Sequence, residues 1–109
     1  MAEALKILGQ SKPAAGVLTA AYTVPAATTT VVSTITVCEQ AGVATSFRLS
    51  AAVAGAADTP SQYLVYNAPL KANETLALTL GITLGIADVV RVSSLGGSVS
   101  FNLFGVEKT

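Results

Sequence analysis

The 109-residue sequence has no histidine, no tryptophan and a single cysteine, Cys38. Without histidine, the chain lacks the commonest general base and the commonest zinc ligand. One cysteine excludes an intrachain disulfide, and we interpret Cys38 as a small buried hydrophobic residue because it follows the apolar run 35–37. We therefore expect no catalytic residue, no bound metal and no cofactor, and we predict that the protein is not an enzyme.

Charged residues are also scarce, at 11% of the chain, and six basic residues balance six acidic ones. Ordinary soluble domains have about 25% charged residues. A net charge of zero provides no attraction for nucleic-acid phosphates or an anionic membrane, so we expect neither partner. A surface built from Ala, Thr, Ser, Val and Gly is poorly solvated and favours association. We predict a homo-oligomer, a dimer or a trimer; the alternative is a monomer whose Thr and Ser suffice for solubility.

The longest uncharged run lies between Lys12 and Glu39, longer than the roughly 20 residues of a membrane-spanning helix. Pro25 interrupts this run, and its many threonines and valines favour strands over a helix. The first residues contain Glu3 and no sustained apolar stretch before Pro13, unlike a secretory signal. We therefore expect no membrane span and a soluble product made in the cytoplasm, which assembly after synthesis could carry elsewhere.

From Gly16 onward, hydrophobic residues recur at every second position, the period of a β-strand. The clearest alternation covers residues 75–84, with Leu and Ile at even positions and small or weakly polar residues at odd positions. In the segment 46–53, the pattern predicts that Phe47 and Leu49 face the core and that Arg48 and Ser50 face water. The expected strands are 17–24, 29–39, 46–53, 62–66, 75–84, 88–93 and 98–106.

Turn-forming residues separate these segments. Pro25 and the stretches 54–60 and 67–69 are predicted to end strands. We expect Gly96 and Gly97 to form a hairpin turn between the last two strands. Gly81, inside the alternating segment, is predicted to mark a bulge or a bend across a sandwich corner.

The series of about seven to eight short strands predicts an all-β fold, an antiparallel β-sandwich or jelly roll, formed by residues 16–109 as a single domain. Residues 1–15 do not follow the pattern. Leu5, Ile7 and Leu8 with their flanking charges predict an N-terminal arm, lying on a neighbouring subunit, or a short helix. A frayed terminus is the alternative.

Four acidic residues beside strands are the candidates for paired catalytic carboxylates: Glu39, Asp58, Glu74 and Asp88. Acids at such positions commonly cap turns, and we favour this interpretation. Asp58 and Asp88 could bind calcium through loop oxygens, but no Asp-x-Asp spacing supports this. We assign no catalytic, cofactor-binding or metal-binding residue.

Two groups of larger side chains raise the question of a binding surface. Arg48, Lys71 and Arg91 could form a basic patch, but isolated charges usually lie on solvated strand faces. A carbohydrate-binding sandwich would need an exposed aromatic cluster with polar neighbours. Tyr63 and Tyr66 are the only aromatic pair close in sequence, and their spacing predicts opposite faces of a strand.

The spacing of strands and turns from Tyr22 to Glu107 carries a resemblance to a known group of proteins. Its segments are 22–26, 29–33, 37–38, 63–66, 72–81, 88–92 and 100–107. They are similar to small β-sandwich structural proteins of tailed bacteriophages, which occur as capsid decoration (cement) proteins and as neck, tail or fibre components.

This resemblance implies a non-enzymatic virion protein with no site residues to carry over. A compact single sandwich favours a capsid decoration protein that binds the major capsid protein, or another virion protein, and stabilises the head. A neck, tail or fibre component is the alternative, and a carbohydrate-binding module is a second one. We expect the contacts at residues 1–13, 54–60 and 95–98.

Overall fold

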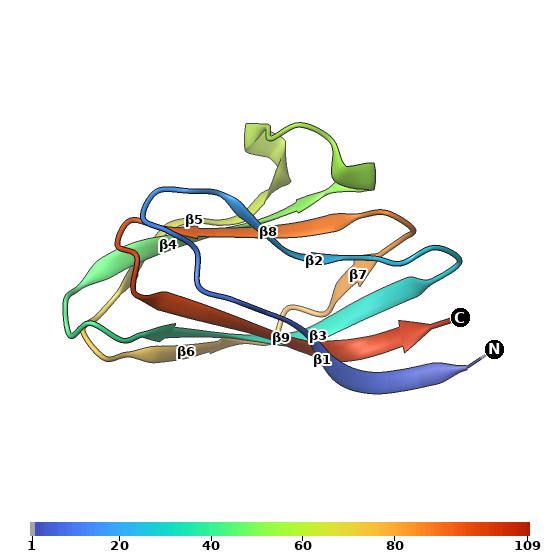
Figure 1. Cartoon of the computed structure of the whole chain (residues 1–109), viewed down its shortest axis with the longest axis horizontal. Helices are drawn as coiled ribbons and strands as arrows, with labels where there is room; N and C mark the ends of the chain where they lie inside the picture. Colours follow the sequence, from blue (N-terminus) through green and yellow to red (C-terminus); the bar gives the residue numbers. More distant parts are fainter. Residues whose placement is uncertain (1) are drawn as a thin grey trace.

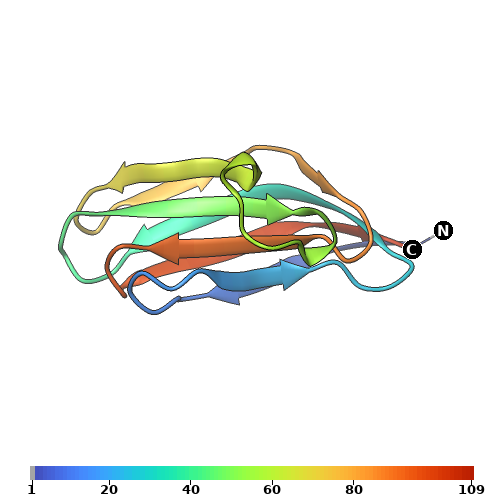
Figure 2. The same ribbon diagram turned by 90° about the horizontal axis from the view of Figure 1, so that it is seen from above.

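The computed structural model describes residues 2–109, in which two antiparallel sheets pack face to face (Figures 1 and 2). Within these residues there are nine strands: β1 (Glu3–Ser11), β2 (Thr19–Thr23), β3 (Thr29–Glu39), β4 (Thr45–Ala52), β5 (Tyr63–Leu70), β6 (Thr75–Leu78), β7 (Ile82–Leu84), β8 (Val89–Ser94) and β9 (Val99–Lys108). Two single 3₁₀ turns, η1 (Val53–Gly55) and η2 (Pro60–Gln62), lie between β4 and β5. The predicted all-β sandwich is confirmed, with slightly more strands than expected.

The strands divide unequally between the sheets. One sheet has the order β1-β9-β3-β6, with β7 also paired to β3, and the other has the order β2-β8-β4-β5. Chain neighbours such as β3 and β4 therefore belong to different sheets, so the connections cross repeatedly from one layer to the other. No helix within the described residues is long and apolar enough to cross a membrane.

The core fills the space between the two sheets, and the alternating residues of the central strands supply it. Ile35 and Val37 of β3 are almost completely buried, as are Val90 and Val92 of β8. Across the layers the rings of Phe47 and Phe101 meet edge to face, with centroids 6.0 Å apart. Each large apolar side chain buried in this way contributes about 1.5–3 kcal/mol to folding.

The first residues correct the expectation of a helical turn or a projecting arm. Glu3–Ser11 is strand β1, which pairs antiparallel with β9 of its own chain, from Glu3 opposite Lys108 to Ser11 opposite Phe101. An irregularity between Ile7 and Gly9 interrupts the pairing. A period-2 pattern is hard to detect here because this bulge breaks the alternation.

Of the two alternatives for Gly81, the bend across a sandwich corner is wrong, and the hairpin predicted at Gly96 and Gly97 is wrong as well. Gly81 has a positive φ of 63° and separates β6 from β7, yet both strands pair with β3, so the bend stays within one sheet and does not turn a corner. Gly96 and Gly97 do not form a hairpin. They connect β8 to β9, which belong to opposite sheets.

The side of the four-stranded sheet that points away from the core is more buried than the alternating pattern predicts. Ser50 was expected to face water, but it is completely buried. Residues 53–62, which connect β4 to β5 and contain η1 and η2, fold back over this side of the sheet (Figure 1). We call this segment the excursion. A strand residue that points away from the core is therefore enclosed by a loop.

Candidate functional site

Hydrogen bonds fasten the excursion between β4 and β5 to the sheet beneath it. The guanidinium group of Arg91 donates to the carbonyl oxygens of Gly55 (3.1 Å) and Ala56 (2.8 Å). The carboxylate of Asp88 accepts a hydrogen bond from the backbone amide of Ala54 at 2.8 Å. These contacts hold the excursion in place, so it can form one wall of a site.

The structure overturns the prediction that Tyr63 and Tyr66 lie on opposite faces. Their ring centroids are 5.1 Å apart and their planes meet at 85°, an edge-to-face contact. The pairing between β4 and β5 explains this. Leu49 pairs with Val65 and Ser50 pairs with Tyr63, so Leu64 is an extra residue in β5. One extra residue reverses the alternation and returns both tyrosines to the same side.

Arg48 completes what we call the tyrosine cluster: Arg48, Tyr63 and Tyr66. The guanidinium carbon of Arg48 lies 4.1 Å from the centroid of the Tyr66 ring, a cation–π contact. Its Nε donates to Oδ1 of Asn67 at 2.7 Å, and this orients the guanidinium plane. The Tyr66 side chain nevertheless remains 59% exposed.

A hollow of about 400 Å³ opens beside the tyrosine cluster, walled on its other side by Asp58, Thr59 and Pro60. The Tyr63 hydroxyl donates to the Asp58 carboxylate at 3.1 Å. Partial burial, followed by the hydrogen bond to the Asp58 carboxylate, raises the pKa of Tyr63. The hollow thus combines aromatic surface with a carboxylate and a guanidinium group, a combination suited to polar ligands.

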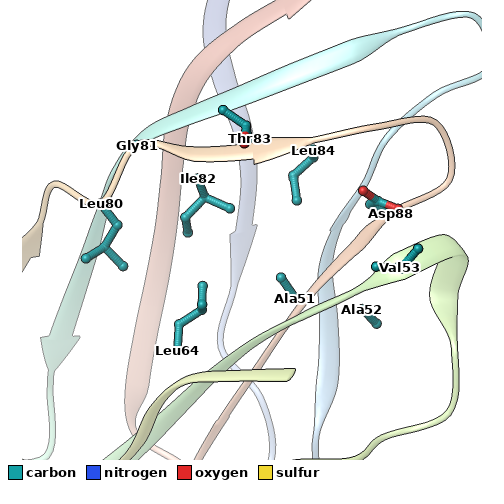
Figure 3. A pocket seen from close by; sticks show the side chains of 10 residues that line it. All are labelled: Ala51, Ala52, Val53, Leu64, Leu80, Gly81, Ile82, Thr83, Leu84 and Asp88. Carbon is teal, nitrogen blue, oxygen red and sulfur yellow. The ribbon is translucent and has the colours of Figure 1, made fainter. Parts of the chain in front are cut away.

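A second depression, the apolar groove, lies where the sandwich is open between β5 and the β6–β7 edge. In Figure 3, Leu64, Leu80 and Ile82 point toward one another across it. Its volume is about 510 Å³, and Leu64 and Leu80 are each 49% exposed. Gly81 forms part of the rim, and a Cβ at this position would meet nothing within 4 Å.

Glu39, one of the four candidate acids, is a buried turn cap. Its carboxylate accepts hydrogen bonds from the backbone amides of Ala41 (2.8 Å), Gly42 (2.8 Å) and Val43 (3.2 Å), and of Asn73 (3.0 Å) in a separate turn. The hydrogen bond from Asn73 is the largest cause that lowers the pKa of Glu39, and burial acts in the opposite direction. Glu39 joins two turns at one end of the sandwich.

The remaining acids occupy separate places in the fold. Asp88 accepts hydrogen bonds from the amides of Ala54 and Gly85, and Glu74 accepts one from the amide of Lys71 at 2.8 Å. Asp58 faces the hollow described above. Across residues 2–109, no group of three or more His, Cys, Asp or Glu side chains comes together.

The basic residues are likewise separated in function. Arg48 belongs to the tyrosine cluster, Arg91 is bonded to the excursion, and Lys71 lies in the turn between β5 and β6. Both arginines donate side-chain hydrogen bonds to groups of their own chain. These N–H groups are therefore not free to bind a ligand. This supports the interpretation of these charges as parts of the fold.

A further surface feature is the outer face, by which we mean the side of the five-stranded sheet that points away from the core. The strand register gives its main residues: Leu5, Ile7, Val31, Thr34, Thr36, Cys38, Thr75, Ala77, Asn102, Phe104 and Val106. Cys38 was expected in the core, but it is only half-buried on this face. Among the described strand residues of this face, charges occur only at one end, where Lys108 and Glu3 lie 3.4 Å apart.

Fold and surface together define an antiparallel β-sandwich with one nearly uncharged sheet face and one tyrosine-lined hollow. Comparison with known protein families finds no family that matches the chain, and no curated protein matches it.

Proposed function

We propose that this chain is a non-enzymatic structural protein of a tailed-phage particle, and specifically a capsid decoration protein. In this proposal it binds the major capsid protein or another virion protein as a homo-oligomer, and its final location is the virion. The observation that carries the proposal is the outer face, which is broad, nearly free of charge and formed by the paired strands of the five-stranded sheet. The resemblance in strand spacing supports the same class.

The chemistry of the outer face suits burial against another protein. Interface centres are depleted of charged residues, and sheets can pack face to face at about 10 Å. Val31, Thr34 and Thr36 are β-branched, so their side chains lose little rotamer freedom when covered. Phe104 supplies an aromatic contact within the same face.

In the proposed mechanism, the binding free energies of many bound copies add together. A decoration protein that bridges neighbouring capsid subunits contributes a modest interaction at each site, and the sum over many copies resists expansion of the head. Phosphate-binding and membrane-binding surfaces are not required. A neck, tail or fibre component would use the same kind of face, and the particle fraction that is bound separates the two.

The test measures binding of the purified protein to separated heads and tails of the phage that encodes it. Binding to heads that saturates at a fixed copy number supports the proposal, whereas binding to tails alone supports a tail component. Thr36→Lys places a charge in the middle of the outer face and should weaken head binding at least about tenfold. Ala72→Lys, an exposed substitution in the β5–β6 turn, is the matched control. Equal binding by both variants would remove the outer face from the proposal.

The tyrosine cluster supports a second candidate, a carbohydrate-binding module. The exposed Tyr66 ring, the Asp58 carboxylate and the hollow between them meet the requirement for aromatic surface beside polar groups. A panel of bacterial surface glycans would be titrated against the protein by NMR. Binding that Tyr66→Ala abolishes would support this candidate, and shifts that persist in that variant would remove the cluster from consideration.

A further inference from the structure

Strand β1 is an open edge of the five-stranded sheet. Ala2 and Thr109 exchange both backbone hydrogen bonds, at 3.2 and 2.9 Å. In an antiparallel ladder such hydrogen-bonded pairs recur at every second residue, so Ala4 and Lys6 also direct their amides and carbonyls toward β9. The residues between them direct these groups away from the sheet: Glu3, Leu5 and Ile7.

The side chains at this edge are also exposed. Leu5 is 84% exposed and Ile7 is 53% exposed. They lie on the outer face, opposite Val106 and Phe104 of β9. A long edge with free backbone groups and exposed apolar side chains is a template for pairing with another strand.

The other edges of the sandwich are less suited to pairing. Strand β2 has only five residues and a register irregularity after Ala20. Strand β5 contains Pro69 and the positive-φ residue Asn67. The β6–β7 edge is interrupted at Gly81. Short strands, prolines, bulges and charged side chains are the features by which proteins protect their edges. Strand β1 has no proline, and it has the bulge after Ile7 and the charged residues Glu3 and Lys6.

We propose that β1 pairs antiparallel with β1 of a second copy, about a twofold axis that passes through Leu5. The two five-stranded sheets then become one continuous sheet. This inference rests on the homo-oligomer included in the proposed function, and it adds the surface, the symmetry and the register. Leu5 pairs with Leu5 of the second copy and Glu3 with its Ile7, and each of these pairs exchanges two backbone hydrogen bonds.

The regular part of β1, residues 3–7, is centred on Leu5 and selects this register. With the axis at Leu5, Lys6 lies opposite Ala4 of the second copy. With the axis at Lys6, Glu3 would lie opposite Gly9 of the second copy, beyond the irregularity that follows Ile7, so fewer regular pairs would form. With the axis at Ile7, the pairing would run through the irregularity that follows Ile7 and lose its regular hydrogen bonds.

Lys6 does not itself block the edge. Inward-pointing charges on an edge strand commonly prevent pairing. Here the ammonium group of Lys6 already binds the carboxylate of Glu107 of its own chain at 2.7 Å, so its charge is compensated whether or not a second strand is present. The small side chain of Ala4 leaves room for it.

The first experiment measures the mass of the whole protein by light scattering over a wide range of low concentrations. The wild type is expected to dimerise. Leu5→Pro removes the outward amide at the axis without removing a hydrogen bond to β9, and should raise the dimer Kd by about tenfold or more. Leu5→Val keeps the amide and an apolar side chain and should dimerise like the wild type. Circular dichroism verifies that each variant is folded.

The second experiment tests the register by charge. Leu5→Lys and Leu5→Glu each place like charges across the axis, so each variant alone should be monomeric and an equimolar mixture should form dimers. Ile7→Lys is the matched control, because its lysine would face Glu3 of the second copy and the dimer should persist. A monomeric wild type, or a Leu5→Pro variant that dimerises like the wild type, overturns the inference. If Ile7→Lys were monomeric while Leu5→Lys remained a dimer, the proposed register with its axis at Leu5 would be wrong.

These results are independent of head binding. If Thr36→Lys lost head binding but remained a dimer, the result would show that the outer face binds heads without affecting the β1 pairing. A monomeric protein that still binds heads would refute the β1 pairing and the homo-oligomer, and would leave the proposed binding to the capsid standing.

Discussion

The hydroxyl of Tyr22 provides a sharp test of how the two sheets are joined. Tyr22 belongs to β2 in the four-stranded sheet, and its side chain is buried. Its hydroxyl lies 2.7 Å from Oγ1 of Thr30 in β3 and donates to Oε2 of Glu107 in β9 at 2.6 Å. Tyr22→Phe keeps the ring and removes only this bridge between the sheets.

The expected decrease in the free energy of unfolding follows from the two hydrogen bonds that the variant loses. A neutral hydrogen bond contributes about 0.5–1.5 kcal/mol net, and one to a charged group about 1.5–3 kcal/mol. Glu107 keeps its bond to Lys6 in the variant, so part of the second contribution remains. We expect Tyr22→Phe to lower the free energy of unfolding by about 2 kcal/mol, and Tm by roughly 10 °C.

The same hydroxyl predicts a pH dependence. Burial, followed by the hydrogen bond to Glu107, raises the pKa of Tyr22 from 10.0 to about 12. A raised pKa means that the stabilisation is fully present below the unfolded value of 10.0 and is lost as the pH rises toward about 12. Between these values the wild type should lose stability, and the difference between wild type and Tyr22→Phe should shrink.

The assay is urea denaturation of wild type and variant at equal protein concentration, at neutral pH and through the alkaline range. Tyr66→Phe is the control, because the exposed Tyr66 hydroxyl has no hydrogen bond within residues 2–109, and its removal should change stability by less than about 0.5 kcal/mol. If Tyr22→Phe matched that control at neutral pH, the bridge would not contribute to stability and the reasoning would be refuted.

Glu39→Gln replaces an acceptor of turn amides by a group that also donates, and should lower Tm by roughly 5 °C or more. Because the pKa of Glu39 is lowered in the folded state, its stabilisation is present above the unfolded pKa of about 4.3 and is lost as the pH falls through the folded value. The variant should therefore show a shallower acid dependence in thermal melts, and identical acid limbs would contradict this. Phe101→Ala leaves a cavity beside Phe47 and should lower the free energy of unfolding by about 3–5 kcal/mol, measured by urea denaturation. A decrease below about 1 kcal/mol would show that the surrounding core closes the cavity. Gly105→Ala would direct its Cβ against the backbone carbonyl of Val31, and should cost about 2 kcal/mol or more in the same assay; a neutral result would mean that β3 shifts freely.

The comparison of sequence and structure is clearest in the central strands. The alternation in 29–39 predicts β3 with the bounds that the structure has, and Ile35 and Val37 face the core as expected. The same alternation would also place Val31 inward, but the irregular pairing between Val32 and Thr34 puts Val32 in the core and Val31 on the outer face. Alternation is a local property, since successive side chains of any strand point to opposite sides. The fold class and the inward residues of regular strands follow from it.

Irregular pairing breaks this local rule. The extra residue Leu64 reverses the alternation of β5 and brings Tyr63 and Tyr66 together, although their spacing predicts opposite faces. The irregularity after Ile7 obscures β1 in the same way. A bulge depends on the strand opposite, so a single segment does not reveal it.

What the sequence by itself determined is the β-sandwich class, the bounds of β3 and, to within one residue, those of β4 and β8, and a surface poor in charge. It did not determine the end of β5, because residues 67–69, predicted to end a strand, lie inside Tyr63–Leu70. Only the tertiary structure decided that Gly96 and Gly97 join opposite sheets, that the excursion buries Ser50, and that β1 remains an open edge. The physical reason is distance along the chain. Periodicity and turn propensity act within a few residues, whereas strand partners and loop coverage are set by contacts between segments far apart.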